Sequence, residues 1–184
     1  LPSYSVFAEE ENQAKETQTN ETNETQADET TANDTLSLAA ETAVLIDAAS
    51  GEILYDKDAD KKMYPASITK LMTILLALEN GKLTDEITFS HDAVYNIEPG
   101  SAHIAILEGE TLTLEQVLRA IILRSANEAS NGVAEYVDGS VEAFAKHMTE
   151  RAKELGCTNT NFVNANGLFD ENHYTTAHDM ALIA

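Results

Sequence analysis

The stretch "YPASITKLMT" (residues 64–73) decides how this sequence is interpreted. Pro65 punctuates the chain, and we predict a helix that begins near Ser67 and runs to about Asn80. The helix is apolar nearly all round, which is typical of a central buried helix. Lys70 is out of place there, because a buried ammonium group costs free energy unless it is paired or neutral.

Ser67 and Lys70 lie three residues apart, so on a helix they share one face. A serine at a helix N-terminus lies beside the positive end of the helix dipole, which favours an alkoxide. A desolvated lysine one turn away would have a lowered pKa and could accept the serine proton. The pair therefore predicts a nucleophile and its base. The alternative is an N-cap serine with a lysine that reaches out to water.

A second polar pair lies in Ser125-Ala126-Asn127, between two strongly apolar segments. With one residue between them, the serine and the asparagine can point into the same cleft. The hydroxyl of Ser125 could relay a proton, and the amide of Asn127 could hold a substrate amide through one donor and one acceptor. The alternative for this stretch is a polar turn between helices.

The other predicted elements combine short strands with helices. They are a β-hairpin over 42–56, strand-like pieces at 86–90 and 102–107, a helix from a capping box at Thr113 to about Leu123, an interruption over 124–131, a helix through Val133 and Tyr136, an amphipathic helix over 140–156 and a short helix from about Thr176. The apolar stripe of the amphipathic helix comprises Val141, Phe144, Ala145, Met148, Ala152 and Leu155.

The first part of the chain differs in composition from the rest. Residues 9–35 contain no aromatic and no large aliphatic side chain, so we expect an acidic, disordered linker. Residues 1–8 resemble the end of a secretory signal peptide, although an arbitrary boundary would look the same. The globular part is expected over 36–184. A formal net charge of −21 argues against nucleic acid or an anionic membrane surface as a partner.

Cysteine and histidine offer little further chemistry. A single cysteine, Cys157, excludes an internal disulfide, and we interpret it as structural. The five histidines show no H-E-x-x-H or similar pairing, so we predict neither a metal site nor a cofactor. No apolar run approaches 18 residues, the length that a transmembrane helix needs.

Three blocks of sequence, in this order, resemble one family. They are residues 41–73 with Ser67 and Lys70, residues 112–137 with Ser125 and Asn127, and residues 155–184. Together they resemble the D-alanyl-D-alanine carboxypeptidases, the low-mass penicillin-binding proteins among the active-site serine penicillin-recognising enzymes. The resemblance covers 36–184.

The resemblance implies an α+β fold, with an antiparallel sheet flanked by helices, of the kind shared by β-lactamases and DD-peptidases. It implies that Ser67 is acylated, Lys70 is its base, Ser125 relays a proton and Asn127 binds substrate. The substrate would be a peptidoglycan peptide ending in D-Ala-D-Ala, and β-lactams would acylate the same serine. The protein would act outside the cytoplasmic membrane without a cofactor, with possible membrane attachment through its C-terminus.

Two features depart from the family pattern. Residues 164–167 read Asn-Ala-Asn-Gly, where the family usually has a proline and a histidine before the glycine. No Lys-Thr-Gly follows Asn127, although the family places this triplet on a strand that recognises substrate and supplies an oxyanion donor. We therefore expect an N-terminal fragment that lacks the C-terminal strands and has little turnover by itself.

Two other functions stay open. A serine β-lactamase would share both polar pairs but would need a deacylation device, for which Glu171 is a loose candidate. A non-catalytic peptidoglycan-binding module would keep its effect without Ser67. His173 and Asp179 invite a triad with Ser67, but a lysine-based mechanism needs neither, and we interpret both as structural.

Overall fold

The computed structural model of the protein describes residues 37–184. The predicted signal-peptide remnant (1–8) and acidic linker (9–35) lie outside these residues. Among the described residues, none of the helices has the length and apolar character needed to span a membrane.

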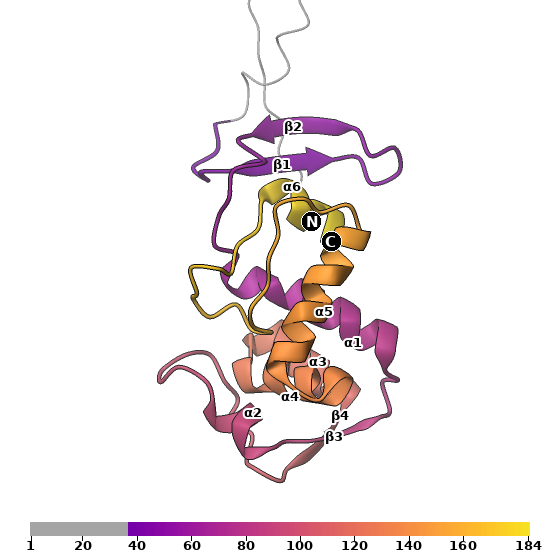
Figure 1. The fold of residues 1–184 in the computed structure, drawn as a ribbon, viewed down its shortest axis with the longest axis vertical. Coiled ribbons are helices and arrows are strands. Elements are labelled where there is room, and N and C mark those ends of the chain that lie inside the picture. Colours follow the sequence, from indigo (N-terminus) through magenta and orange to yellow (C-terminus); the bar gives the residue numbers. More distant parts are fainter. Residues whose placement is uncertain (1–36) are drawn as a thin grey trace, which may run out of the picture. The chain divides into compact units, whose positions relative to one another are not determined.

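The described chain opens with the predicted β-hairpin. Strands β1 (Ala43–Ile46) and β2 (Ile53–Lys57) pair antiparallel, with a register shift near the end of β1. The Asp47 carboxylate closes the turn by accepting hydrogen bonds from Ser50, as expected of an Asx turn. Helix α6 (Ala177–Ile183) packs against β1, so the two ends of the described region meet (Figure 1). This hairpin confirms the prediction for residues 42–56.

The segment around Ser67 differs from the single helix that we predicted. A 3-10 helix, η1 (Ala66–Thr69), comes first, and α1 begins only at Lys70 and ends at Asn80. Ala66, the first residue of η1, has a positive φ of 49°, which lies outside the right-handed helical region. The prediction of a helix buried on all sides was also wrong, since Leu71 and Leu78 are 43% and 52% exposed.

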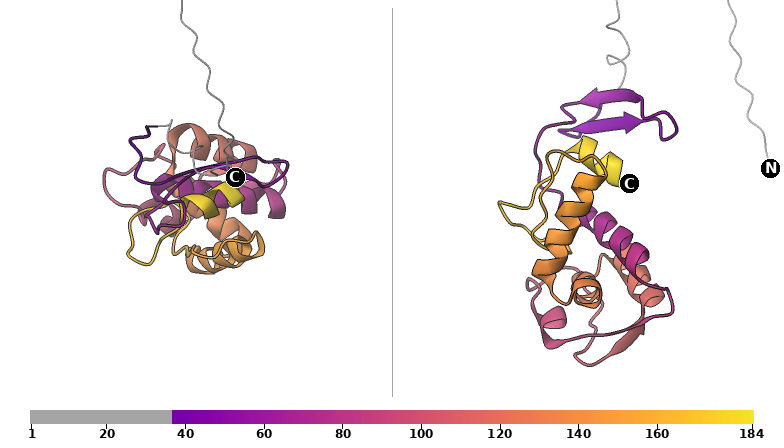
Figure 2. Two further views of the ribbon diagram at one scale, coloured as in Figure 1. Left: turned by 90° about the horizontal axis from the view of Figure 1, so that it is seen from above. Right: turned by 45° about the vertical axis from the view of Figure 1, so that its right-hand side comes forward.

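Helix α4 (Asn127–Asp138) is the centre of the helical part. It packs against α1, α2 (His91–Tyr95), α3 (Leu114–Arg124) and α5 (Val141–Glu154), which surround it in Figure 2. The predicted interruption over 124–131 was too long, because α4 starts at Asn127. Its polar first turns are buried rather than looped out, and burial supplies the stability that their composition lacks.

A second small sheet pairs β3 (Glu86–Thr88) with β4 (Thr111–Thr113). The predicted strand over 102–107 was wrong. The backbone N–H groups of Ile104, Ala105 and Leu107 bond to side chains instead of to a neighbouring strand. With two antiparallel sheets and helices α1 to α6 in the described region, the structure confirms the α+β class.

The C-terminal helices follow the predicted pattern. The capping box at Thr113 is present, and Thr176 caps α6. Four members of the apolar stripe on α5 are buried, namely Phe144, Ala145, Met148 and Ala152. The core therefore forms where the faces of α1, α3, α4 and α5 meet.

Candidate active site

Ser67 lies on the 3-10 turn, with its side chain at the surface. The left-handed conformation of Ala66, directly before it, bends the backbone sharply. Among the described residues, no acceptor takes the Ser67 N–H. An exposed hydroxyl beside a free N–H is the arrangement that oxyanion stabilisation requires.

Lys70 is buried directly behind Ser67 and is only 4% exposed. Its Nζ donates to the Asn127 Oδ1 at 2.8 Å and to the Asn166 carbonyl oxygen at 2.5 Å, and it lies 3.4 Å from the Ser67 Oγ. Burial lowers the pKa of Lys70 to about 8. Three oxygen atoms, from Asn127, Asn166 and Ser67, therefore surround the amine.

The side chains of Asn127 and Ser125 differ in their hydrogen bonding. Asn127 is the first residue of α4, 4% exposed, and its side chain holds Lys70. Ser125 closes α3 in the left-handed conformation, with φ of 54°. Its Oγ is buried and makes no hydrogen bond with any described residue. The structure therefore brings Ser67, Lys70 and Asn127 together, while the Ser125 hydroxyl contacts none of them through a hydrogen bond.

The loop 164–167 adds a site residue that the sequence reasoning missed. Asn166 is 4% exposed; its carbonyl oxygen accepts from Lys70, and its Nδ2 donates to the Asn131 Oδ1 at 3.1 Å. Asn164 shapes the loop, since its Oδ1 accepts from the Gly167 N–H at 2.7 Å. An Asn-x-Asn-Gly pattern is typical of a tight turn, but nothing in it points to the lysine.

His173 joins the turn η1 to the chain at Val163. Its Nε2 lies 2.8 Å from the Thr69 Oγ1, and its Nδ1 accepts the Val163 N–H at 3.1 Å. Because Nδ1 is an acceptor, Nε2 carries the hydrogen and donates to Thr69. Burial lowers the pKa of His173 to about 4, so the ring is neutral. His173 makes no hydrogen bond with Ser67, which agrees with a structural role.

The side chains of Asp179 and Cys157 also form hydrogen bonds that do not involve Ser67. The carboxylate of Asp179 accepts from Thr158, Asn159 and Thr160 and not from His173, so no triad forms with Ser67. Burial raises the pKa of Cys157 to about 11, which leaves an inert thiol at neutral pH. Glu171 is exposed in a turn. Over residues 37–184, no group of three His, Cys, Asp or Glu side chains could hold a metal ion.

Comparison with known proteins gives this arrangement a family. The family model described as D-alanyl-D-alanine carboxypeptidase matches residues 25–184, which include both polar pairs. The chain belongs to the D-alanyl-D-alanine carboxypeptidase family. This confirms the resemblance that the three sequence blocks carried.

Individual members of the D-alanyl-D-alanine carboxypeptidase family agree in sequence and in fold. D-alanyl-D-alanine carboxypeptidase DacF of Bacillus subtilis is 42% identical over 154 residues, which are 81% of this chain and 39% of DacF. Penicillin binding protein 5 of Haemophilus influenzae superposes with a TM-score of 0.74 at 33% identity, over 80% of this chain and 44% of that one. A DD-transpeptidase from Streptomyces superposes with a TM-score of 0.76 at 25% identity, over 81% of this chain and 61% of that one. The chain spans about two fifths of the length of the curated relatives it matches.

Proposed function

We propose that this chain is part of a serine D-Ala-D-Ala carboxypeptidase that trims peptidoglycan stem peptides through an acyl-enzyme on Ser67. The observation that carries the proposal is the set of partners around the Lys70 Nζ. A neutral amine has two N–H donors and one lone pair. Asn127 and Asn166 accept the two hydrogens, so the lone pair is left for the Ser67 hydroxyl.

The chemistry follows from these positions. The Ser67 Oγ bonds to the carbonyl carbon of the penultimate D-alanine while its proton passes to the Lys70 Nζ. The Ser67 N–H stabilises the oxyanion that forms. The C–N bond to the terminal residue then breaks, and the leaving nitrogen takes the proton that the Lys70 Nζ accepted, so D-alanine leaves and Lys70 is neutral again. Water hydrolyses the ester and restores the Ser67 hydroxyl. No step needs a metal or an organic cofactor.

Ser125 and Asn127 have the proposed roles of proton relay and substrate ligand. The buried, unpaired Oγ of Ser125 supports a relay that acquires its partners only when substrate is present. The amide of Asn127 is oriented by its bond to Lys70, and its Nδ2 remains available as a donor. β-Lactams, whose ring carbonyl can replace the substrate amide, would acylate Ser67 in the same way.

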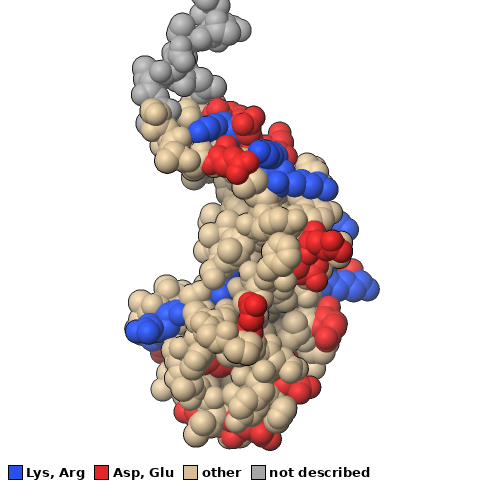
Figure 3. All heavy atoms as spheres, turned by 90° about the vertical axis from the view of Figure 1, so that its left-hand side faces the viewer, with Lys and Arg blue, Asp and Glu red and all other residues tan. Residues whose placement is uncertain are grey.

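The proposed location is outside the bacterial cytoplasmic membrane, where peptidoglycan lies, with a signal peptide directing export and membrane attachment through a C-terminal segment. Nucleic acid is not a proposed partner. The formal net charge of −21 supports this, as does the face in Figure 3, where acidic and basic side chains are interspersed.

Labelling of the intact gene product with a fluorescent penicillin tests the proposal. We expect one covalent penicilloyl group per chain on Ser67, seen by mass spectrometry of the tryptic peptide, and no label on Ser67→Ala. Release of D-alanine from a D-Ala-D-Ala pentapeptide should require the same serine. A slowly released adduct supports the carboxypeptidase, whereas rapid turnover of penicillin would support a β-lactamase. A Ser67→Ala protein with full biological effect would support a non-catalytic module.

A further inference from the structure

Helix α4 holds a neighbouring segment through its first two residues. The Asn127 N–H donates to the Ala102 carbonyl oxygen at 2.9 Å, and the Glu128 Oε1 accepts the Ile104 N–H at 2.7 Å. We call these two bonds the 102/104 clamp. The first bond satisfies an N–H that a helix N-terminus leaves unpaired. The second bond ties the segment to Glu128. This residue directly follows Asn127, whose side chain accepts a hydrogen bond from Lys70.

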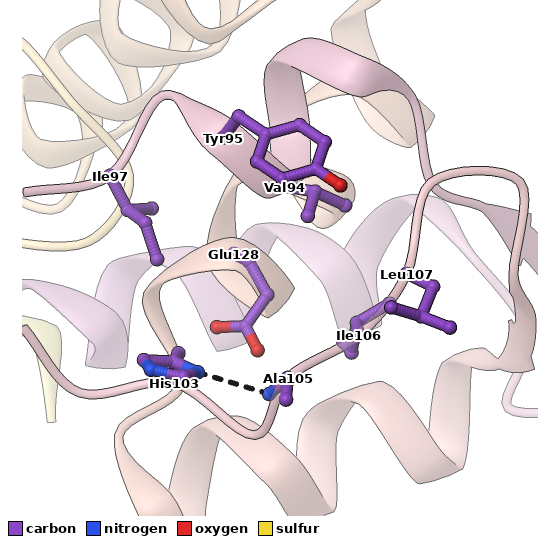
Figure 4. Close-up of a pocket in the computed structure, with 8 residues that line it drawn as sticks. All are labelled: Val94, Tyr95, Ile97, His103, Ala105, Ile106, Leu107 and Glu128. Atoms are coloured by element: carbon purple, nitrogen blue, oxygen red, sulfur yellow. Dashed lines mark hydrogen bonds between the residues drawn. The ribbon is translucent and has the colours of Figure 1, made fainter. Parts of the chain in front are cut away.

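A glutamate is unexpected at position 128 because the side chain there is buried. Its side chain is 1% exposed, and its second carboxylate oxygen, Oε2, has no hydrogen-bond partner. It lies in the wall of a cavity of about 360 Å³ that is otherwise mostly apolar, lined by residues of α2, by Ile97 and by the 102–107 segment (Figure 4). Burying a half-satisfied carboxylate costs free energy that an apolar side chain would avoid. The bond to Ile104 offsets that cost only in part.

The clamped segment is strained. Ala105 has a φ of +62°, a left-handed conformation that is unfavourable for an alanine. Its N–H turns back to the His103 Nδ1 at 3.1 Å, so it bonds to no other strand or helix. Such a conformation persists only where surrounding contacts determine it. Ile106 of this segment is buried in the core, and the 102/104 clamp ties the segment by hydrogen bonds to the helix carrying Asn127.

We propose that Glu128 is a positioning residue for the reaction, acting through the 102/104 clamp. It holds the 102–107 segment against the head of α4 and so fixes the Asn127 amide relative to the Lys70 Nζ. This inference rests on the proposed function, because it assigns a purpose to Glu128 within that reaction. Glu128 itself touches neither Ser67 nor Lys70 through a hydrogen bond.

Two substitutions separate positioning from simple support of the fold. Glu128→Gln keeps an oxygen at Oε1 for the Ile104 N–H, whereas Glu128→Ala removes it. In the intact gene product, we expect Glu128→Ala to lower the second-order rate constant of acylation by fluorescent penicillin roughly tenfold, since a small misplacement of a catalytic group is enough for such a loss. Glu128→Gln should stay within about threefold of wild type. The final label should remain one per chain in both.

The matched control is Glu115→Ala, which removes a glutamate from the first turn of α3. It should leave the rate constant unchanged. A Glu128→Ala protein with the wild-type rate constant would overturn the proposal. So would a loss confined to the fraction of chains that take label, because that indicates partial unfolding. Equal decreases of the acylation rate constant in Glu128→Gln and Glu128→Ala would also overturn the proposal.

A readout independent of activity keeps the proposed function and the clamp distinguishable. By NMR, the Ile104 amide should exchange faster in Glu128→Ala than in Glu128→Gln, and the titration midpoint of Lys70 should move only in the alanine variant. If the wild-type protein takes no penicillin label, the proposed function fails. The exchange rate of the Ile104 amide and the titration midpoint of Lys70 still decide whether Glu128 positions Asn127 relative to Lys70. Unchanged exchange and an unchanged midpoint would refute the clamp.

Discussion

A lysine ammonium group is stable in a protein interior only if its hydrogens are satisfied. Lys70 meets this condition with Asn127, Asn166 and Ser67, while desolvation still lowers its pKa to about 8. At neutral pH the amine is mostly protonated, and the neutral base that we expected is the smaller population. The site therefore holds a base whose proton is removed within an accessible pH range.

The first prediction concerns pH. Because the neutral form of Lys70 increases as pH rises through its pKa, we expect the rate constant for acylation of Ser67 to rise by roughly tenfold for each pH unit below about 8 and to level off above it. Stopped-flow measurement with fluorescent penicillin between pH 6 and pH 9.5 checks this. A rate constant that stays flat over this range would contradict a base titrating near 8.

The second prediction concerns stability at low pH. His173 binds a proton near 6.5 when unfolded but only near 4 when folded, so protons favour the unfolded state between these values. Its contribution is fully present above about 6.5 and is lost as pH falls towards 4, by roughly 3 kcal/mol in total. Urea denaturation at several pH values measures this.

His173→Gln is the matched variant, since glutamine can donate to Thr69 and accept from Val163 but does not titrate. The difference in pH dependence between the wild type and His173→Gln isolates the histidine from the carboxylates. Parallel curves for the two proteins between pH 7 and pH 4 would show that His173 is not buried in its neutral form.

At the scale of elements, the loop 164–167 and the turn η1 fit together without space. Gly167 has a φ of +85°, and a Cβ added there would lie 1.9 Å from the Ala66 carbonyl oxygen. Only glycine allows this approach. The loop therefore supports the backbone directly before Ser67 and, through Asn166, also binds Lys70.

The third prediction is that Gly167→Ala disrupts the site. The added methyl group must displace Ala66, so we expect acylation to slow by about a hundredfold, as for a misplaced catalytic group. Gly51→Ala is the control, because Gly51 also has a positive φ, of 76°, but has nothing within 4 Å of an added Cβ. It should cost about 1 kcal/mol of stability and leave acylation intact. Equal acylation by the two variants would argue against close packing at Gly167.

At the scale of the molecule, the described core depends on close contact between α4 and the chain after β3. Gly132 on α4 faces Phe89, which is 1% exposed, and an added Cβ would lie 2.3 Å from the Phe89 Cε1. The ring thus occupies the space that a side chain on α4 would take. This contact joins the small β3–β4 sheet to the helix that carries Asn127.

The fourth prediction follows from that contact. Gly132→Ala should lower the free energy of unfolding by about 1–3 kcal/mol through overpacking, although alanine is otherwise the better helix residue. Phe89→Leu should relieve the clash, so the double variant should be more stable than the sum of the single effects predicts. Additive effects in urea denaturation would show that Phe89 moves aside freely.

Much of this molecule could be predicted from local patterns. The hairpin, the capping box at Thr113 and the stripe on α5 depend on residues close in sequence, and each was found as predicted. The strand over 102–107 failed because Glu128, more than twenty residues away, takes the Ile104 N–H that a strand would use. The segment around Ser67 forms the 3-10 helix η1 before α1, and its first residue, Ala66, has a left-handed φ and packs against Gly167 from a distant loop.

The sequence by itself determined the family and the fold class, through the order of its three blocks. It also placed Ser67 within one turn of Lys70, because the two residues are three apart in a helical segment wherever that segment packs. Only the tertiary structure decided what surrounds the lysine. Its two close acceptors come from residues 57 and 96 positions away in the chain. No pattern within one segment encodes such contacts, because they arise when separate segments are packed together and a buried amine must find partners.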